Sequence, residues 1–255
     1  MKKYITIAAL LAAGSALANA ALTEIADFSE LVSGKTSIGT VTDVSSQYTS
    51  GNTVYSFSNN GAFTNLDNSD VLGALNGSSG VVTVAAWIYL DADASTYNTV
   101  FGLGESETGL KFGVKNDDLF CVTKNVKETV KGFSIAKETW TLVAFQYNVA
   151  DKNFRLQATE TDGQFYTISD NTTMNTPGTF TFAIGSANGN ASSGAEDFQG
   201  MIANLTVFTS TGYEQNSTVL TALGAAPTLI PEPSVFGLLA GLGALALVGT
   251  RRRRR

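Results

Sequence analysis

Closely spaced carboxylates are the residues of this chain that could take part in hydrolytic chemistry. Glu160 and Asp162 lie two positions apart, and so do Glu105 and Glu107. Residues two apart share one face of a β-strand, and two carboxylates can serve as the acid and the nucleophile or base of glycoside hydrolysis. Gly163 directly follows the first pair and indicates a turn instead of a strand. We therefore expect that the chain is not an enzyme.

Histidine is absent, and Cys121 is the single cysteine. This composition excludes the Ser-His-Asp triad, the Cys-His pair and metal sites built from histidine. It also excludes an intrachain disulfide. Cys121 lies in an apolar segment with strand character, so we expect a small buried hydrophobic residue there.

Pairs of acidic residues in expected loops make calcium the one cofactor to consider. Calcium binds six to eight oxygen ligands, mostly carboxylates and backbone carbonyls of loops. The pairs are Asp67 and Asp70, Asp91 and Asp93, Asp117 and Asp118, and Glu196 and Asp197. None belongs to an EF-hand sequence, and a solvated turn also explains each pair.

The central part of the chain is strongly acidic. The full sequence has 16 basic and 22 acidic residues. Lys2, Lys3 and the five residues Arg251–Arg255 lie at the two ends, which leaves nine basic residues in the middle. An acidic domain repels the phosphate backbone, so we expect no nucleic-acid partner.

An alternating strand marks the middle of the sequence. Val81–Leu90 carries apolar residues on both faces, with Val84 and Ile88 on one and Ala85 and Trp87 on the other. This predicts a central strand covered on both sides. Further segments with strand spacing are Val54–Phe57, Phe63–Leu66, Thr99–Leu103, Leu110–Val114, Leu119–Thr123, Trp140–Tyr147, Phe154–Thr159, Phe165–Ile168, Phe180–Ile184 and Met201–Phe208. Short strands at this spacing predict an all-β sandwich or barrel.

Turn and cap residues separate these segments. The sequence Asn59-Asn60-Gly61 predicts a tight turn between two strands, and Asp67–Asp70 predicts a loop. Ser217–Leu223 is the one later segment with helical character, and Gly224 is placed to cap its C-terminus.

The first 20 residues have the organisation of a secretory signal peptide. Lys2 and Lys3 form a basic start, Tyr4–Leu17 is mostly apolar, and Ala18 and Ala20 make a small-x-small cleavage site. We therefore expect export, with signal peptidase cutting after Ala20.

Four segments carry a family resemblance by their order and spacing. They are Val82–Tyr89, Glu138–Asn148, Phe182–Gly185 and Phe198–Phe208. Residues 21–226 resemble a LamG-like domain of the concanavalin A-like lectin/glucanase superfamily. The resemblance implies a jelly-roll sandwich of two antiparallel sheets, with calcium at the rim in some members. Related glucanases use Glu-x-Asp-x-x-Glu on one strand, whereas here Phe165 replaces the third acid after Glu160 and Asp162.

Aromatic residues are the candidates for contacts with sugar rings. Trp87 and Trp140 suit the space between two sheets, so we expect core packing for both. An exposed tyrosine on a concave face would serve a sugar better. The tyrosines that compete for this role are Tyr89, Tyr97, Tyr147, Tyr166 and Tyr213.

The last residues form an ordered series. Residues 227–233 are an expected linker that ends in Pro231, Glu232 and Pro233, and residues 234–250 are an expected transmembrane helix. The cluster Arg251, Arg252, Arg253, Arg254 and Arg255 would remain cytoplasmic. This order resembles the PEP-CTERM sorting signal of Gram-negative bacteria. The resemblance implies an exosortase-type processing enzyme, an inner-membrane anchor before cleavage, and display at the cell surface or in extracellular polysaccharide.

Three functions fit these features. The first is an exported, surface-sorted binding or adhesion protein without catalysis, with carbohydrate or matrix polysaccharide as its partner. The alternative is a structural component of the envelope or exopolysaccharide matrix without a specific ligand. A glycoside hydrolase fits less well, because no complete set of carboxylates is present.

Overall fold

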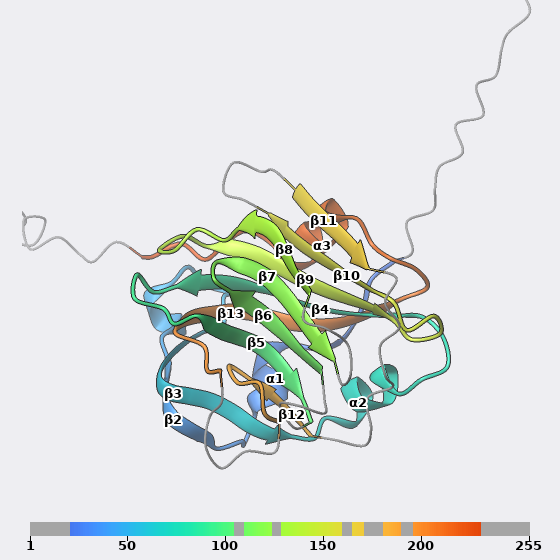
Figure 1. Ribbon diagram of the computed structural model, residues 1–255. Coiled ribbons are helices and arrows are strands. Elements are labelled where there is room, and N and C mark those ends of the chain that lie inside the picture. The colour runs from blue at the N-terminus through green and yellow to red at the C-terminus, as the bar shows by residue number, and fades with distance from the viewer. Residues whose placement is uncertain are drawn as a thin grey trace, which may run out of the picture.

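The computed structural model describes residues 21–104, 110–123, 129–159, 165–170, 181–189 and 196–230 (Figure 1). Within these ranges the strands are β1 (Thr23–Ala26), β2 (Ser37–Asp43), β3 (Val54–Leu66), β4 (Val81–Leu90), β5 (Tyr97–Leu103), β6 (Leu110–Lys115), β7 (Asp118–Thr123), β8 (Thr129–Ser134), β9 (Thr141–Asn148), β10 (Phe154–Thr159), β11 (Phe165–Asp170), β12 (Phe182–Ile184) and β13 (Gly200–Ser210). The helices are α1 (Phe28–Val32), α2 (Ser69–Leu75), α3 (Asn216–Leu223) and the 3-10 turn η1 (Ser45–Gln47).

Antiparallel pairing joins the strands into one path that folds into two layers. The order is β11-β10-β9-β4-β13-β3-β12-β5-β6-β7-β8, with β1 beside β13 and β2 beside β3. We call β11, β10, β9, β4 and β13 the back layer, and β12, β5, β6, β7 and β8 the front layer. β3 pairs with β13 and with β12, so it joins the two layers along one edge. The prediction of an antiparallel, all-β fold is confirmed.

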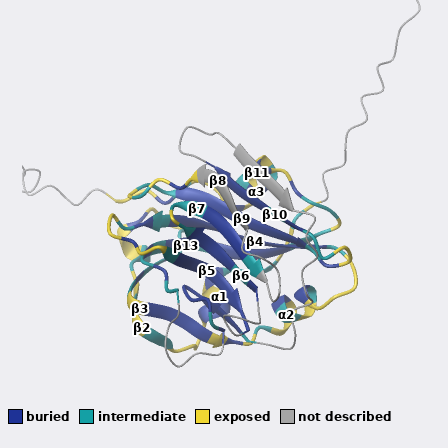
Figure 2. Ribbon diagram, in the orientation of Figure 1, coloured by how far each residue is buried: buried dark blue, intermediate teal, exposed yellow. Residues whose placement is uncertain are grey.

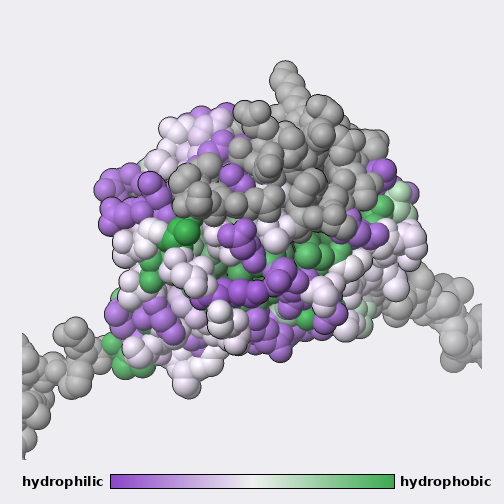
Figure 3. Space-filling view, turned by 90° about the horizontal axis from the view of Figure 1, so that it is seen from below, coloured by the Kyte–Doolittle hydropathy of each residue, from purple (hydrophilic) through white to green (hydrophobic). Residues whose placement is uncertain are grey.

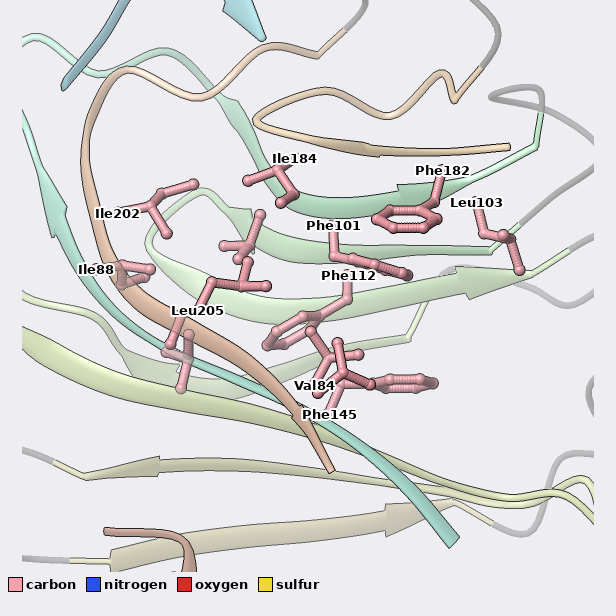
Figure 4. Close-up of a cluster of buried hydrophobic side chains, with 14 of the residues drawn as sticks. Val84, Ile88, Phe101, Leu103, Phe112, Phe145, Phe182, Ile184, Ile202 and Leu205 are labelled. Atoms are coloured by element: carbon pink, nitrogen blue, oxygen red, sulfur yellow. The ribbon is translucent and has the colours of Figure 1, made fainter. Parts of the chain in front are cut away.

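The main core lies between the two layers. Val84, Ile88 and Phe145 of the back layer point toward Phe101 and Phe112 of the front layer (Figure 4). All five side chains are fully buried, and the buried interior continues along both layers (Figure 2). Burying a side chain of this size stabilises the folded state by about 1.5–3 kcal/mol. The alternation predicted for Val81–Leu90 is confirmed, because one of its faces lines this core.

The outer face of the back layer is also covered. Ala85 and Trp87 of β4 belong to a second hydrophobic cluster, which includes Val219 and Leu223 of α3. The indole Nε1 of Trp87 donates a hydrogen bond to the carbonyl of Gly224 at 3.2 Å. The helix therefore packs on the sheet through this cluster. The expected position of the tryptophans between the two sheets is wrong, because Trp87 and the half-buried Trp140 lie with this outer cluster.

β3 is one long strand where the sequence predicted a hairpin. Its first half pairs with β13 and its second half with β12, while β2 pairs with both halves. Asn59 and Asn60 do have positive φ angles of 47° and 60°. They produce a bend with a register shift instead of a reversal, and the pairing with β2 on both sides of this shift keeps the two halves in one strand.

α2 begins inside the segment predicted to be a loop. The Asn68 side chain accepts hydrogen bonds from the backbone N–H groups of Asp70 and Val71 at 3.1 Å each. Such a cap satisfies two of the free donors of a helix N-terminus. Val71 and Leu75 are fully buried and attach the helix to the main core.

The C-terminal helix ends as predicted, but the following segment differs from expectation. The Gly224 N–H donates to the Leu220 carbonyl, and Gly224 has a φ of 78°. Residues 228–230, expected to belong to a linker, instead pair with the domain through a β-bridge between Tyr48 and Leu229. The described chain is thus fixed to the domain as far as Ile230.

Candidate functional site

A polar cluster with one aromatic ring lies on the outer face of the front layer. It consists of Tyr97 of β5, Lys111 and Lys115 of β6, and Glu196, and we call these four residues the front-face cluster. Tyr97, Lys111 and Lys115 are half-buried. Their side chains point away from the main core, which takes Leu110, Phe112 and Val114 from the same strand.

Two ammonium groups lie close to the Tyr97 ring. Lys115 Nζ is 4.5 Å and Lys111 Nζ is 5.8 Å from the ring centroid. Both distances fall within the range of attractive cation–π contacts. Lys111 Nζ also forms an ion pair with Glu196 Oε2 at 2.6 Å. The cluster therefore presents an aromatic ring, cationic donors and a carboxylate within one small area.

Strand register brings these residues together. Tyr97 lies opposite Lys115 in the pairing of β5 with β6, and Lys111 lies opposite Gly102. Lys111 and Lys115 are four positions apart on one strand, so they share a face. Asn116 and Asp117 have φ angles of 49° and 66° and form the two-residue turn from β6 to β7. Asn-Asp suits the positive φ angles that such a hairpin turn requires.

The surroundings of the Tyr97 ring are tightly packed. Phe120 of β7 is fully buried and contacts the Tyr97 ring edge-on, with centroids 5.8 Å apart. Gly113 of β6 pairs with Phe120. A side chain at position 113 would collide with the backbone carbonyl of Asn98. Thr99 Oγ1 is buried and has no hydrogen-bond partner among the described residues. A close-packed base of this kind holds the ring in one position.

The segment that carries Glu196 is fixed to β5. The Thr99 N–H donates to the Glu196 carbonyl at 3.1 Å. The Asn98 side chain accepts from the Gln199 N–H at 3.0 Å and donates to the Ser95 carbonyl at 2.7 Å. These contacts place the Glu196 carboxylate beside Lys111, although the two residues are 85 positions apart in sequence.

The acidic pairs considered for calcium are not assembled into a metal site. Within the described ranges, no group of three or more acidic or cysteine residues could hold a metal ion. Asp67 instead forms an ion pair with Lys35 at 2.5 Å. Burial raises the pKa of Asp91, and the neighbouring carboxylates Asp93 and Glu138 raise it further.

The competing aromatic residues lie elsewhere. Tyr147 is 1% exposed in the main core, so the structure excludes it as a surface contact for a sugar. Tyr89 packs against Trp140 with centroids 5.6 Å apart, and Tyr213 lies under the Arg155 guanidinium at 4.5 Å. These residues and Tyr166 of β11 belong to the back layer or to segments that cover it. Of the candidate tyrosines, Tyr97 is the one on the outer face of the front layer.

Sequence reasoning named Tyr97 and Glu196 but missed the two lysines. A usable signal was present, because Lys111 and Lys115 alternate with core residues directly before a hairpin turn. The prediction for Cys121 is confirmed: the thiol is buried in the main core, and burial raises its pKa.

Several predicted residues lie outside the described ranges. They are Ala18, Ala20, Pro231, Glu232, Pro233, the arginines 251–255, and the acids Glu105, Glu107, Glu160 and Asp162. In the part of the chain that is described, no helix has the length and apolar character needed to cross a membrane.

Comparison with known proteins gives the following matches. No curated protein sequence matches the chain. Domain 4 of AbnA, an extracellular arabinanase from Geobacillus stearothermophilus solved with arabinotriose, has a TM-score of 0.49 and 16% identity, covering 81% of this chain and all of that one. The CBM40 of the Ruminococcus gnavus IT-sialidase, bound to α2,3 sialyllactose, has a TM-score of 0.45 and 10% identity, covering 80% and 97% of the two chains.

A family model provides the assignment. The Laminin_G_3 model, described as concanavalin A-like lectin/glucanases superfamily, matches residues 58–212. The match includes the whole of β4, β9 and β13, and it also includes the four residues of the front-face cluster. Because the match extends over more than half of the sequence, the chain belongs to the concanavalin A-like lectin/glucanases superfamily.

Proposed function

We propose that this protein is an exported carbohydrate-binding protein without catalytic activity, which binds acidic polysaccharide through the front-face cluster. The observation that carries the proposal is the Tyr97 ring with two lysine ammonium groups within 6 Å of its centroid. Membership of a superfamily of lectins and glucanases supports carbohydrate as the class of ligand.

The chemistry of the cluster suits a charged sugar. An aromatic ring offers a flat apolar surface, and a few placed polar groups fix the orientation of a ligand. Lys111 and Lys115 supply two local ammonium donors, whereas the net charge of −6 repels polyanions, so the preference for a charged sugar depends on these short contacts. Charge-assisted hydrogen bonds to a sugar carboxylate are stronger than those to a neutral hydroxyl. Uronic-acid polymers should therefore bind better than neutral glucans.

Binding without turnover agrees with the state of Glu196. Its carboxylate forms an ion pair with the Lys111 ammonium at 2.6 Å. Glycoside hydrolysis requires an acid held in its protonated form together with a second carboxylate. The front-face cluster has Glu196 as its single carboxylate, so it lacks the second of these groups.

The two chain ends are the basis for proposing export and surface sorting. The signal-peptide features of residues 1–20 support export, and the series from Pro231 to Arg255 supports sorting by an exosortase-type enzyme. In this scheme the residues from 234 onward first hold the domain at the outer side of the inner membrane. Cleavage near Pro231–Pro233 then releases it to the cell surface or extracellular polysaccharide.

Binding of residues 21–230 to polygalacturonate and to dextran tests the ligand class. We expect binding to the uronic-acid polymer and at least about tenfold weaker binding to dextran, which corresponds to about 1.4 kcal/mol. Tyr97→Ala should weaken binding to polygalacturonate by about tenfold or more, as for an aromatic residue at the centre of a contact.

Tyr213→Ala is the matched control. Tyr213 is also a half-buried tyrosine beneath a cationic side chain, but it contacts Arg155 on the back layer. This variant should bind like the wild type. Equal affinity of wild type and Tyr97→Ala would refute the site. Failure of the wild type to bind any glycan would instead favour the structural role without a specific ligand.

A further inference from the structure

The segment before the Pro-Glu-Pro sequence is held on the domain by backbone hydrogen bonds. The Thr49 N–H donates to the Thr228 carbonyl at 2.9 Å, and the Ile230 N–H donates to the Gln47 carbonyl at 2.8 Å. Tyr48 lies opposite Leu229 between these two bonds. The domain therefore extends to Ile230, one residue before Pro231.

The same segment carries exposed apolar side chains. Leu229 is 60% and Ile230 is 50% exposed, and among the described residues they are the large hydrophobic side chains that remain exposed. Figure 3 shows hydrophobic surface at the left, where the described chain ends. Two adjacent exposed apolar side chains at the end of a domain are a candidate interaction surface.

The six residues that pair here are uncharged, and Tyr48 among them is a buried aromatic residue. Gln47–Thr49 and Thr228–Ile230 contain no charged residue. Tyr48 contacts the half-buried Trp140 with ring centroids 5.9 Å apart. Uncharged groups cost little to bring to the lipid headgroup region, and the half-buried Trp140 is of a residue type that is enriched there. We call Gln47–Thr49 together with Thr228–Ile230 the exit face.

The sequence leaves little distance between the exit face and the apolar tail. Three residues, Pro231, Glu232 and Pro233, connect Ile230 to the apolar run that begins at Ser234. Fully extended, three residues span about 10 Å. If the apolar run is in the bilayer, the domain cannot move far from the membrane surface, and the fixed position of Ile230 determines which face is nearest.

We propose that the exit face lies against the phospholipid bilayer in the tail-anchored form of the protein, with Leu229 and Ile230 in contact with lipid. This orientation follows because Thr228–Ile230 is hydrogen-bonded to the domain and three residues connect it to the apolar run. The inference rests on the membrane-anchoring role proposed above for the tail. It goes further by assigning an orientation to the domain and a lipid partner to one of its surfaces.

A fluorescence experiment with the tail-containing chain in phospholipid vesicles tests the orientation. Gln47→Cys places a thiol-reactive fluorophore on the exit face, and Ser78→Cys places one at the opposite end of β4. Both positions are exposed. The ten residues of β4 separate the two ends by about 30 Å. The native Cys121 is buried, so it should not react with the label.

Nitroxide quenchers attached to lipid headgroups then report proximity. We expect several-fold stronger quenching of the label at position 47 than of the label at position 78. A third chain carries about ten Gly and Ser residues between Ile230 and Pro231, which adds an average span of about 17 Å. This insertion should bring the quenching at position 47 close to that at position 78.

The outcomes separate this inference from the anchoring proposal. A chain that does not float with the vesicles refutes anchoring by the tail. A chain that floats but shows equal quenching at both positions refutes the orientation alone. If quenching at position 47 stays strong after the Gly and Ser insertion, the short connection to the tail is not what holds the exit face against the membrane. If the fluorescence at position 47 changes with the amount of protein per vesicle and not with the nitroxide lipid, the exit face contacts a second copy of the protein instead of lipid.

Discussion

Glu214 is a buried carboxylate in an otherwise neutral polar group. It is 1% exposed, and its Oε1 atom has no hydrogen-bond partner among the described residues. Its backbone, in contrast, is well bonded. The carbonyl accepts from the side chains of Gln146 and Gln157 at 3.0 and 2.9 Å, and the N–H donates to Gln146 Oε1 at 2.7 Å. The backbone position is thus determined, while the carboxylate is desolvated.

This arrangement predicts a pH-dependent stability. Burial raises the pKa of Glu214, so the folded state keeps a proton that the unfolded state releases. Stability should therefore fall as the pH rises from the ordinary glutamate pKa through the raised one. Glu214→Gln, which resembles the protonated acid, should lose less stability between pH 4 and pH 7 than the wild type. Urea unfolding of residues 21–230 at both pH values measures the difference.

Glu24→Gln provides the control for this experiment, because the Glu24 side chain is exposed on β1. It should leave the loss of stability between the two pH values close to that of the wild type. If Glu214→Gln loses as much stability as the wild type, the carboxylate is not the source of the pH dependence.

At the scale of single residues, the sequence predicted burial better than position. The strand pattern correctly placed Cys121 in the interior. It failed for Trp87, because a covered outer face and the space between two layers give the same apolar pattern on β4. It could not select Tyr97 from five tyrosines. The exposure of each tyrosine depends on the layer that its strand joins, and pairing between strands that are distant in sequence determines the layer.

At the scale of elements, the regular strands were predictable and the bend in β3 was not. β4, β9 and β13 carry strong alternation, so their existence follows from local sequence. Asn59-Asn60-Gly61 has the composition of a reversing turn, yet β2 pairs on both sides of it. The pairing partner thus decides the outcome where the local signal favours a hairpin. α2 was missed because Asn68 and Asp70 serve as helix-start residues as well as loop residues.

The bend makes a specific prediction for Gly61. A side chain at this position would collide with the backbone carbonyl of Thr40 on β2. Gly61→Ala should therefore force β2 and β3 apart and destabilise the domain by about 1–3 kcal/mol. For a domain of this size, this corresponds to a decrease in Tm of about 2–4 °C for each kcal/mol. Thermal unfolding of residues 21–230 followed by circular dichroism measures the change.

Gly73→Ala is the matched control, because it makes the same chemical change on α2. No atom lies within 4 Å of the added methyl group. Alanine is favoured over glycine inside a helix, so this variant should gain about 0.5–1 kcal/mol. Unchanged stability of Gly61→Ala would contradict the packing described for the bend, and equal destabilisation by Gly73→Ala would show that the loss does not come from the contact with Thr40.

At the scale of the whole molecule, the two ends of the domain leave from different places (Figure 1). β1 pairs with the last residues of β13. In contrast, the hydroxyl of Tyr48, a residue of the exit face, lies 3.1 Å from the sulfur of Met201 near the start of β13. The N-terminal attachment and the C-terminal exit are thus separated by most of the length of β13. Removal of a signal peptide at one end would not disturb the segment that precedes the sorting sequence at the other.

This separation leads to a prediction for the sorting sequence itself. Replacing Pro231, Glu232 and Pro233 with alanine changes none of the described residues 21–230. In a Gram-negative host with an exosortase-type protease, the wild type should lose its apolar tail and leave the inner membrane. The triple alanine variant should keep the tail and remain in the membrane fraction. Mass spectrometry of the C-terminal peptide distinguishes the two forms.

Thr228→Ala controls for any change close to the cleavage region, since the Thr228 side chain is exposed and its bond to Thr49 uses the backbone carbonyl. It should be processed like the wild type. Loss of the tail from the triple alanine variant would show that cleavage does not depend on Pro-Glu-Pro. The resemblance to a sorting signal would then not describe how this protein is processed, although carbohydrate binding by the domain would be unaffected.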